Sequence, residues 1–249
     1  MSKNDAGASS PLAGKAVPRN LLIDTDALAK HYYGIFPELS DPAQRVSFGT
    51  SGHRGSSLKG SFTEAHVLAI AQAICDYRRL MHLDCPVFVG MDTHLLSALA
   101  QETVLEVLAS NSMDVKVQAG GGVTPTPVIS HAILSFNKGR QEHFADGIII
   151  TPSHNPPEDG GIKYNPPTGG PADEAATGWI QDRANVLLEG GNQEVRRASL
   201  SGKAPSATDM ITPYVEDLRQ VVNMERIAEA GLRLAVDPLG GSSLPYWEP

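Results

Sequence analysis

The strongest constraint on the fold is an apolar run that ends in a serine bracketed by prolines. Residues 147–150 read GIII, which predicts a short buried strand. Residues 151–157 then read TPSHNPP. Proline fixes its own φ and biases the preceding residue toward extended geometry. We therefore expect a buried strand that delivers Ser153 in a stiff loop at its carboxyl end, where open α/β sheets bind ligands.

The residues after this loop suit a nucleophile site. Gly160 and Gly161 precede Lys163, and such glycines let the backbone approach an anion closely. A serine hydroxyl needs a base or an activating charge. One hypothesis is a serine hydrolase, but the surroundings of Ser153 do not match the G-x-S-x-G elbow.

A second hypothesis is that Ser153 carries a phosphoryl group and passes it on. Phosphoserine bears roughly −1.5 to −2 charges, so it needs cations or N–H donors around it. Lys163 could shuttle a proton if its pKa fell by roughly 3 units from about 10.4, a change of about 4 kcal/mol. A third interpretation is an ordinary proline-rich surface turn.

The rest of the chain alternates between strand and helix patterns. Besides 147–150, we expect strands at 46–48, 86–90, 114–118 and 232–236. We expect helices from Asp24 or Thr25 to near Pro37, from a Ser61–Glu64 capping box to near His82, and over 95–108, 127–136, 173–190, 208–222 and 224–230. This alternation predicts an α/β fold with a mixed, largely parallel sheet flanked by helices, followed by the start of a second similar α/β domain.

A basic glycine-rich loop precedes the capping box. Residues 45–60 contain Arg45, Arg54 and Lys59 and no acidic residue, in a chain whose formal net charge is −8. Such a loop suits an anionic phosphate. His53 lies in the same loop, but we do not expect it to be a ligand.

Three motifs, in this order, resemble those of the α-D-phosphohexomutase superfamily, and together they are similar to its bacterial phosphoglucomutases. The motifs are FGTSGHRG at 48–55, TPTP at 124–127, and TPSHNP at 151–156 followed by GGIKYN and GGPAD. The resemblance spans nearly the whole chain.

The resemblance implies a phosphoserine at Ser153 and a general acid/base at Lys163. It also implies that Arg54, His154, Thr50 and Ser51 contact phosphate or sugar hydroxyls. Mg²⁺ would bind Ser153 through its phosphate. No Asp-x-Asp-x-Asp cluster occurs in the sequence to supply the other ligands of the metal.

The activity that the resemblance implies is an isomerase reaction, the interconversion of α-D-glucose 1-phosphate and glucose 6-phosphate. Glucose 1,6-bisphosphate would be the intermediate. Action on mannose or glucosamine phosphates stays open, because the sugar-reading loop is not found in this sequence. So does a third class, a folded but non-catalytic fragment.

Composition bounds the remaining expectations. The negative net charge argues against general nucleic-acid binding, and no apolar run approaches the length of a membrane span. Two cysteines form no metal or disulfide pattern, which favours a reducing, cytoplasmic location. The partner we expect is a hexose phosphate, and the sequence leaves the oligomeric state open.

We expect four segments along the chain. These are a flexible arm at 1–20, a first domain with the serine loop at 21–190, a linker at 191–206 and the beginning of a truncated second domain at 207–249.

Overall fold

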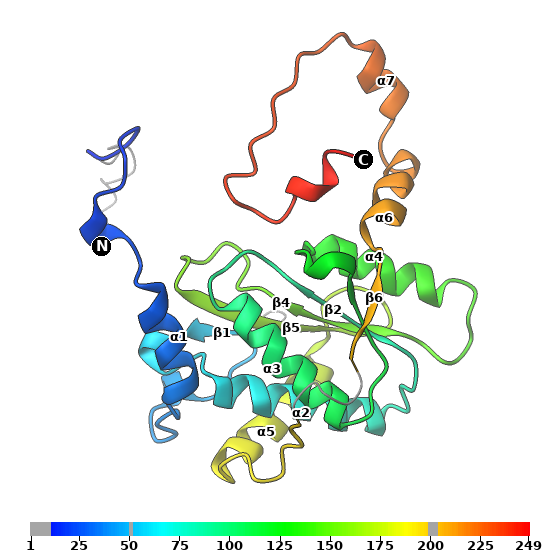
Figure 1. The fold of residues 1–249 in the computed structure, drawn as a ribbon. Helices are drawn as coiled ribbons and strands as arrows, with labels where there is room; N and C mark the ends of the chain where they lie inside the picture. The colour runs from blue at the N-terminus through cyan, green and yellow to red at the C-terminus, as the bar shows by residue number, and fades with distance from the viewer. Residues whose placement is uncertain (1–10, 50–51, 199–203) are drawn as a thin grey trace.

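The computed structural model describes residues 11–49, 52–198 and 204–249, and it contains a six-stranded mixed sheet between two layers of helices (Figure 1). The strands are β1 (Gly52–Ser56), β2 (Val87–Met91), β3 (Val115–Gln118), β4 (Asp146–Ile150), β5 (Asp159–Asn165) and β6 (Ser206–Thr208), in the spatial order β1-β5-β4-β2-β3-β6. β4, β2, β3 and β6 run parallel, whereas β5 is antiparallel to both of its neighbours. The predicted α/β class with a largely parallel sheet is confirmed.

The helices are α1 (Thr25–Gly34), α2 (Glu64–Leu80), α3 (Ser97–Ser110), α4 (Thr126–Asn137), α5 (Glu174–Glu189), α6 (Ile211–Asp217) and α7 (Met224–Glu229). Short 3-10 turns lie at Arg19–Leu21, Pro42–Gln44, Ser57–Lys59, Ala119–Gly121, Leu218–Gln220 and Leu244–Tyr246. α2, α3 and α5 cover one face of the sheet, and α4 covers the other, with α6 beside it (Figure 1).

The central strands explain why the sheet is covered on both faces. Every residue of β4 is buried, and β2 is buried over its first four residues. Ile148 and Ile150 join the larger apolar core under α2, α3 and α5, whereas Ile149 joins a smaller core under α4. A parallel strand that is buried along its whole length must be covered on both faces of the sheet.

The antiparallel edge of the sheet was not predicted. β1 and β5 lie where the sequence indicated loops, and the strand expected at 46–48 is reduced to one bridge between Phe48 and His53. Glycines make this edge possible. A Cβ at Gly52 would lie 2.2 Å from the Ile162 carbonyl oxygen, so only glycine allows β1 and β5 to pair this closely. The same glycines led us to expect a loop.

Helix starts agree with the sequence to within two residues except at α2 and α6. The helix expected over 208–222 begins at Ile211, since Thr208 belongs to β6, and it ends at Asp217. Asp24 and Asp173 cap α1 and α5 by accepting hydrogen bonds of 2.9 Å from backbone N–H groups. α2 is capped by Thr63, whose N–H donates to His66 Nδ1 at 3.2 Å, so the predicted Ser61–Glu64 box is wrong. The buried imidazole of His66 accepts the capping hydrogen bond that we expected Glu64 to accept.

The carboxyl-terminal part departs most from expectation. Ser206–Thr208 joins the first sheet as β6, beside β3. Residues 232–236, expected to be a strand, form none, and Leu232 and Leu234 are exposed. A strand needs a partner for its backbone N–H and C=O groups, and none of the described residues pairs with this segment. The domain limits given above stay predictions.

Candidate active site

The carboxyl ends of three parallel strands meet at one edge of the sheet and form a pocket. β4 leads to Thr151 and Ser153, β2 leads to Asp92, and β3 leads to the turn that ends at Thr124. The pocket has a volume of about 380 Å³. Its lining residues are Asp92, Thr93, His94, Thr124, Pro125, Thr126, Pro127, Thr151, Ser153 and Gly241 to Ser243.

Ser153 occupies a backbone conformation that side chains rarely adopt. Its φ is +73°, its side chain is exposed, and its N–H donates to Thr151 Oγ1 at 2.9 Å. A non-glycine residue in this region stores on the order of 1 to 3 kcal/mol and persists only where its surroundings fix it. The buried Thr151 and Pro152 supply that fixed point, so the serine hydroxyl is presented at the mouth of the pocket.

Gly160 and Gly161 pack against other parts of the protein. We had expected them to let the backbone approach an anion. A Cβ at Gly161 would lie 2.4 Å from the Thr151 carbonyl oxygen, and one at Gly160 would lie 2.4 Å from the Phe62 ring. Gly161 also accepts a hydrogen bond of 2.9 Å from Thr151 N–H through its own carbonyl. The root of the serine loop therefore rests directly on the backbone of β5.

Arg54 and Lys163 project from the same face of the antiparallel edge. In the register of β1 and β5, Arg54 pairs with Gly161 and Gly52 pairs with Lys163. Paired residues share a face, and so do residues two apart, which makes Arg54 and Lys163 diagonal neighbours. Two cationic groups therefore stand beside the root of the serine loop.

The environment of Lys163 lowers its pKa. The side chain is half-buried, and desolvation is the largest cause, followed by the positive charge of Arg54, while the charge of Asp92 acts in the opposite direction. A lowered pKa increases the fraction of neutral amine near neutral pH. That is the direction that a proton-accepting lysine requires.

We expect Arg54→Gln to raise the pKa of Lys163, because the substitution removes a nearby positive charge, and burial alone then keeps that pKa below its ordinary value of 10.5. The pH dependence of acetylation at Lys163, followed by peptide mass spectrometry, measures this. Arg45→Gln is the matched control, since Arg45 pairs with Glu189. An unchanged midpoint in Arg54→Gln would rule out the electrostatic coupling.

His94 belongs to the site, although it was not among the residues predicted from the sequence. Its Nδ1 lies 2.8 Å from Asp92 Oδ2, and its Nε2 lies 3.0 Å from the Asn155 carbonyl oxygen. Each ring nitrogen of His94 thus lies within hydrogen-bonding distance of an oxygen acceptor. His94 thereby ties the end of β2 to the serine loop. The Asp-x-His spacing after a buried strand was the signal that could have found it.

The remaining predicted residues fall into three groups. His154 is exposed next to Ser153 and makes no hydrogen bond to any described residue. Thr50 and Ser51 lie outside the described residues. His53, which we did not expect to be a ligand, is buried, and its Nε2 lies 2.8 Å from the Ser61 carbonyl oxygen.

The side chains around Ser153 do not form a magnesium site by themselves. Asp92 is the carboxylate that lines the pocket, and it already accepts hydrogen bonds from His94 and from Ser97 Oγ at 2.6 Å. Mg²⁺ binds through oxygen ligands in near-octahedral geometry. Within the described part of the chain, the one cluster of three potential metal ligands lies elsewhere, at Asp84, Cys85 and His143.

A membrane-spanning helix would be both long and strongly apolar, and no helix among the described residues meets those two conditions.

Comparison with known proteins agrees with this geometry. Residues 45–189 match the family model described as phosphoglucomutase/phosphomannomutase, alpha/beta/alpha domain I. A phosphoglucomutase of Komagataeibacter xylinus is 51% identical over 244 residues, which are 96% of this chain and 44% of that protein. A phosphoglucosamine mutase of Rhodospirillum rubrum is 30% identical, over 81% of this chain and 42% of that protein.

A solved structure of a putative phosphomannomutase from Thermus thermophilus has a TM-score of 0.60 and 27% identity, over 74% of this chain and 37% of that one. The chain thus spans less than half the length of these relatives.

Proposed function

The chain belongs to the phosphoglucomutase/phosphomannomutase family, and from this we propose that it supplies the phosphorylated serine of a phosphohexomutase, Ser153. The observation that carries the proposal is the placement of that residue. Ser153 is exposed in a left-handed conformation after the carboxyl end of β4, and Arg54 and Lys163 stand beside the root of its loop. The positive φ does not carry the proposal by itself, since the turn at Ser112 adopts it too; the position of Ser153 at the ligand-binding edge of an α/β sheet does.

The reaction we propose is phosphoryl transfer between Ser153 and a hexose phosphate. The phosphorus–Oγ bond of phosphoserine breaks while a bond from phosphorus to a sugar hydroxyl oxygen forms, which gives a hexose bisphosphate. The other phosphoryl group of that bisphosphate then returns to Ser153 Oγ. In this scheme Lys163 accepts the proton of the attacking hydroxyl and returns a proton to Ser153 Oγ as the P–Oγ bond breaks, and Arg54 offsets the negative charge of the transferred group.

Glucose phosphates are the substrates we favour. The relative with 51% identity is named a phosphoglucomutase, whereas the mutase named for glucosamine phosphate is 30% identical. Glucose 1,6-bisphosphate would then be the intermediate, and mannose or glucosamine phosphates are the alternatives. The cytoplasmic location, too, is part of this proposal.

Magnesium enters the proposal only through the phosphate on Ser153. When bound, the ion would neutralise charge on the transferred group. The protein ligands it needs are not assembled among the described residues. The proposed steps therefore depend on Ser153, Lys163 and Arg54 alone.

The function is tested in a chimera in which residues 1–249 replace the matching part of the Komagataeibacter relative. We expect the chimera to turn over glucose 1-phosphate and to carry phosphate on Ser153 by mass spectrometry. The unaltered relative is the control for assay and folding. A chimera that folds but neither turns over glucose 1-phosphate nor carries phosphate on Ser153 would contradict the proposed function.

The isolated chain tests the non-catalytic alternative. Incubated with Mg²⁺ and glucose 1,6-bisphosphate, the 249 residues would acquire phosphate on Ser153 if this domain accepts the group alone. A folded chain without phosphate would indicate that transfer needs parts of the longer relatives.

A further inference from the structure

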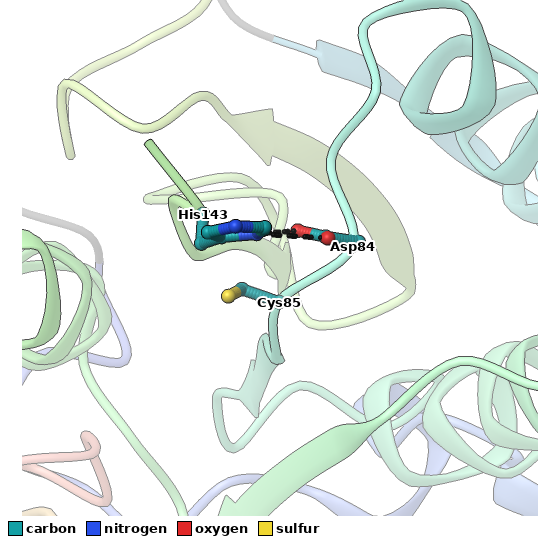
Figure 2. A group of neighbouring side chains, drawn as sticks. All are labelled: Asp84, Cys85 and His143. Carbon is teal, nitrogen blue, oxygen red and sulfur yellow. Dashed lines mark hydrogen bonds and ion pairs between the residues drawn. The ribbon is translucent and has the colours of Figure 1, made fainter. Parts of the chain in front are cut away.

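Three side chains with metal-binding atoms gather at the edge of the sheet opposite the candidate active site. Asp84 and Cys85 lie just before β2, and His143 lies just before β4 (Figure 2). β2 and β4 are parallel and paired, so the amino ends of both strands lie at one edge. Ser153 and Asp92 follow the carboxyl ends of the same strands.

The three ligand atoms are close enough to share one ion. His143 Nδ1 lies 2.9 and 3.0 Å from the two carboxylate oxygens of Asp84, and all three ligand atoms lie within 4.8 Å of one another. Zinc holds oxygen and nitrogen ligands at about 2.0 Å and sulfur at about 2.3 Å, which separates tetrahedral ligand atoms by roughly 3.3 to 3.5 Å. Asp84 and His143 are exposed and Cys85 is partly buried, so side-chain rotations can close the remaining gap.

The backbone on both sides of the cluster is fixed by buried contacts. On one side, the guanidinium of the buried Arg78 donates to the Cys85 carbonyl oxygen. On the other side, the Ala145 N–H donates to Asn137 Oδ1 at 2.7 Å, and Asn137 Nδ2 donates to the Ala145 carbonyl at 2.9 Å. Binding an ion therefore costs little ordering of the main chain.

The charges that face the cluster are mixed. Cys85 interacts electrostatically with the carboxylates of Asp84 and Asp114 and with the guanidinium groups of Arg140 and Arg78. His143 interacts in the same way with Asp84, Glu142 and Arg140. Arg78 is already paired with the buried Asp146. A thiolate formed on metal binding adds one more negative charge, so the occupied site gains the charge that a divalent cation needs.

We propose that Asp84, Cys85 and His143 bind a zinc-class divalent ion, with water in the fourth position. One sulfur, one nitrogen and one oxygen donor suit zinc, whereas magnesium and calcium prefer oxygen alone. The ion replaces the proton shared between His143 and Asp84, and it joins the entry of β2 to the loop before β4. This site is separate from any magnesium held by the phosphoserine.

Calorimetric titration of the 249-residue chain with Zn²⁺, and absorption spectroscopy with Co²⁺, test the site. We expect one ion per chain, no competition from excess Mg²⁺, and a thiolate-to-cobalt charge-transfer band. Cys85→Ser abolishes that band. His143→Ala and Cys85→Ser each weaken Zn²⁺ binding by at least about tenfold, since loss of an outer-shell partner alone costs 10- to 100-fold.

His31→Ala is the matched control, because His31 lies on α1 and bonds the Ala27 carbonyl within its own helix. It leaves Zn²⁺ binding unchanged. Asp84→Asn, at an exposed position, keeps the test decisive if a substitution at Cys85 impairs folding. Zinc affinity that is equal in the wild type and in folded His143→Ala or Asp84→Asn overturns the proposal, as does cobalt binding without a thiolate band.

Discussion

Replacement of Ser153 by alanine is expected to lower phosphoryl transfer by on the order of 10⁴-fold or more, because the substitution removes the atom that bonds to phosphorus. The loss is expected in kcat, since the phosphate and sugar contacts of the other residues remain. Steady-state rates with glucose 1-phosphate in the chimera with the Komagataeibacter relative measure it. Phosphate on the protein is expected to disappear in parallel.

Two further substitutions distinguish the effect of losing the Ser153 hydroxyl from the effect of changing the loop conformation. Ser153→Gly tolerates the positive φ without strain, so it is expected to keep the loop in place and still be inactive. Ser112→Ala changes another exposed serine with positive φ, at the turn after α3, and is expected to keep full activity. Turnover near the wild-type rate in Ser153→Ala would end the proposed function.

The part of the site on β4 was predictable because it depends on local chemistry. An apolar run predicts a buried strand, and the prolines at 152, 156 and 157 predict a stiff loop after it. Both signals lie within a dozen residues of Ser153. The capped starts of α1 and α5 at Asp24 and Asp173 were predictable for the same reason.

The antiparallel edge and His94 were not predictable, because their reasons are distant in sequence. Gly52 and Gly161 read as loop residues, since the atoms that require a missing Cβ belong to Ile162 and Thr151 across the fold. His94 gains its role from the Asn155 carbonyl oxygen, which only the folded chain brings within 3.0 Å. A single-sequence pattern carries no information on such contacts.

Arg78→Met is expected to cost about 3 to 5 kcal/mol of the free energy of unfolding, the largest stability effect we expect from one substitution. Arg78 Nε lies 3.2 Å from Asp146 Oδ2, and the two side chains are 1% and 0% exposed. Tyr164 donates a hydrogen bond of 2.7 Å to the same carboxylate oxygen. Methionine fills similar volume but leaves the buried carboxylate without its cation. Urea unfolding measures the loss.

The adjacent arginine is the matched control. Arg79 pairs with Asp76 at 2.9 Å, but its side chain is 42% exposed, so Arg79→Met is expected to change stability by no more than about 1 kcal/mol. Combining Arg78→Met with Asp146→Asn removes the unpaired charge and is expected to recover part of the loss. Equal effects of Arg78→Met and Arg79→Met would refute the buried-pair interpretation.

The pH dependence of stability gives an independent check on the same pair. Burial raises the pKa of Asp146 from 3.8 to about 6, against the opposing charge of Arg78. Between these two values the native state binds this proton more tightly than the unfolded chain does, so the contribution of Asp146 to stability falls as pH rises through that window. Without Arg78 the pKa of Asp146 rises further, and the decline extends toward neutral pH. Asp146→Asn is expected to remove this slope, and urea midpoints at pH values across the window measure it.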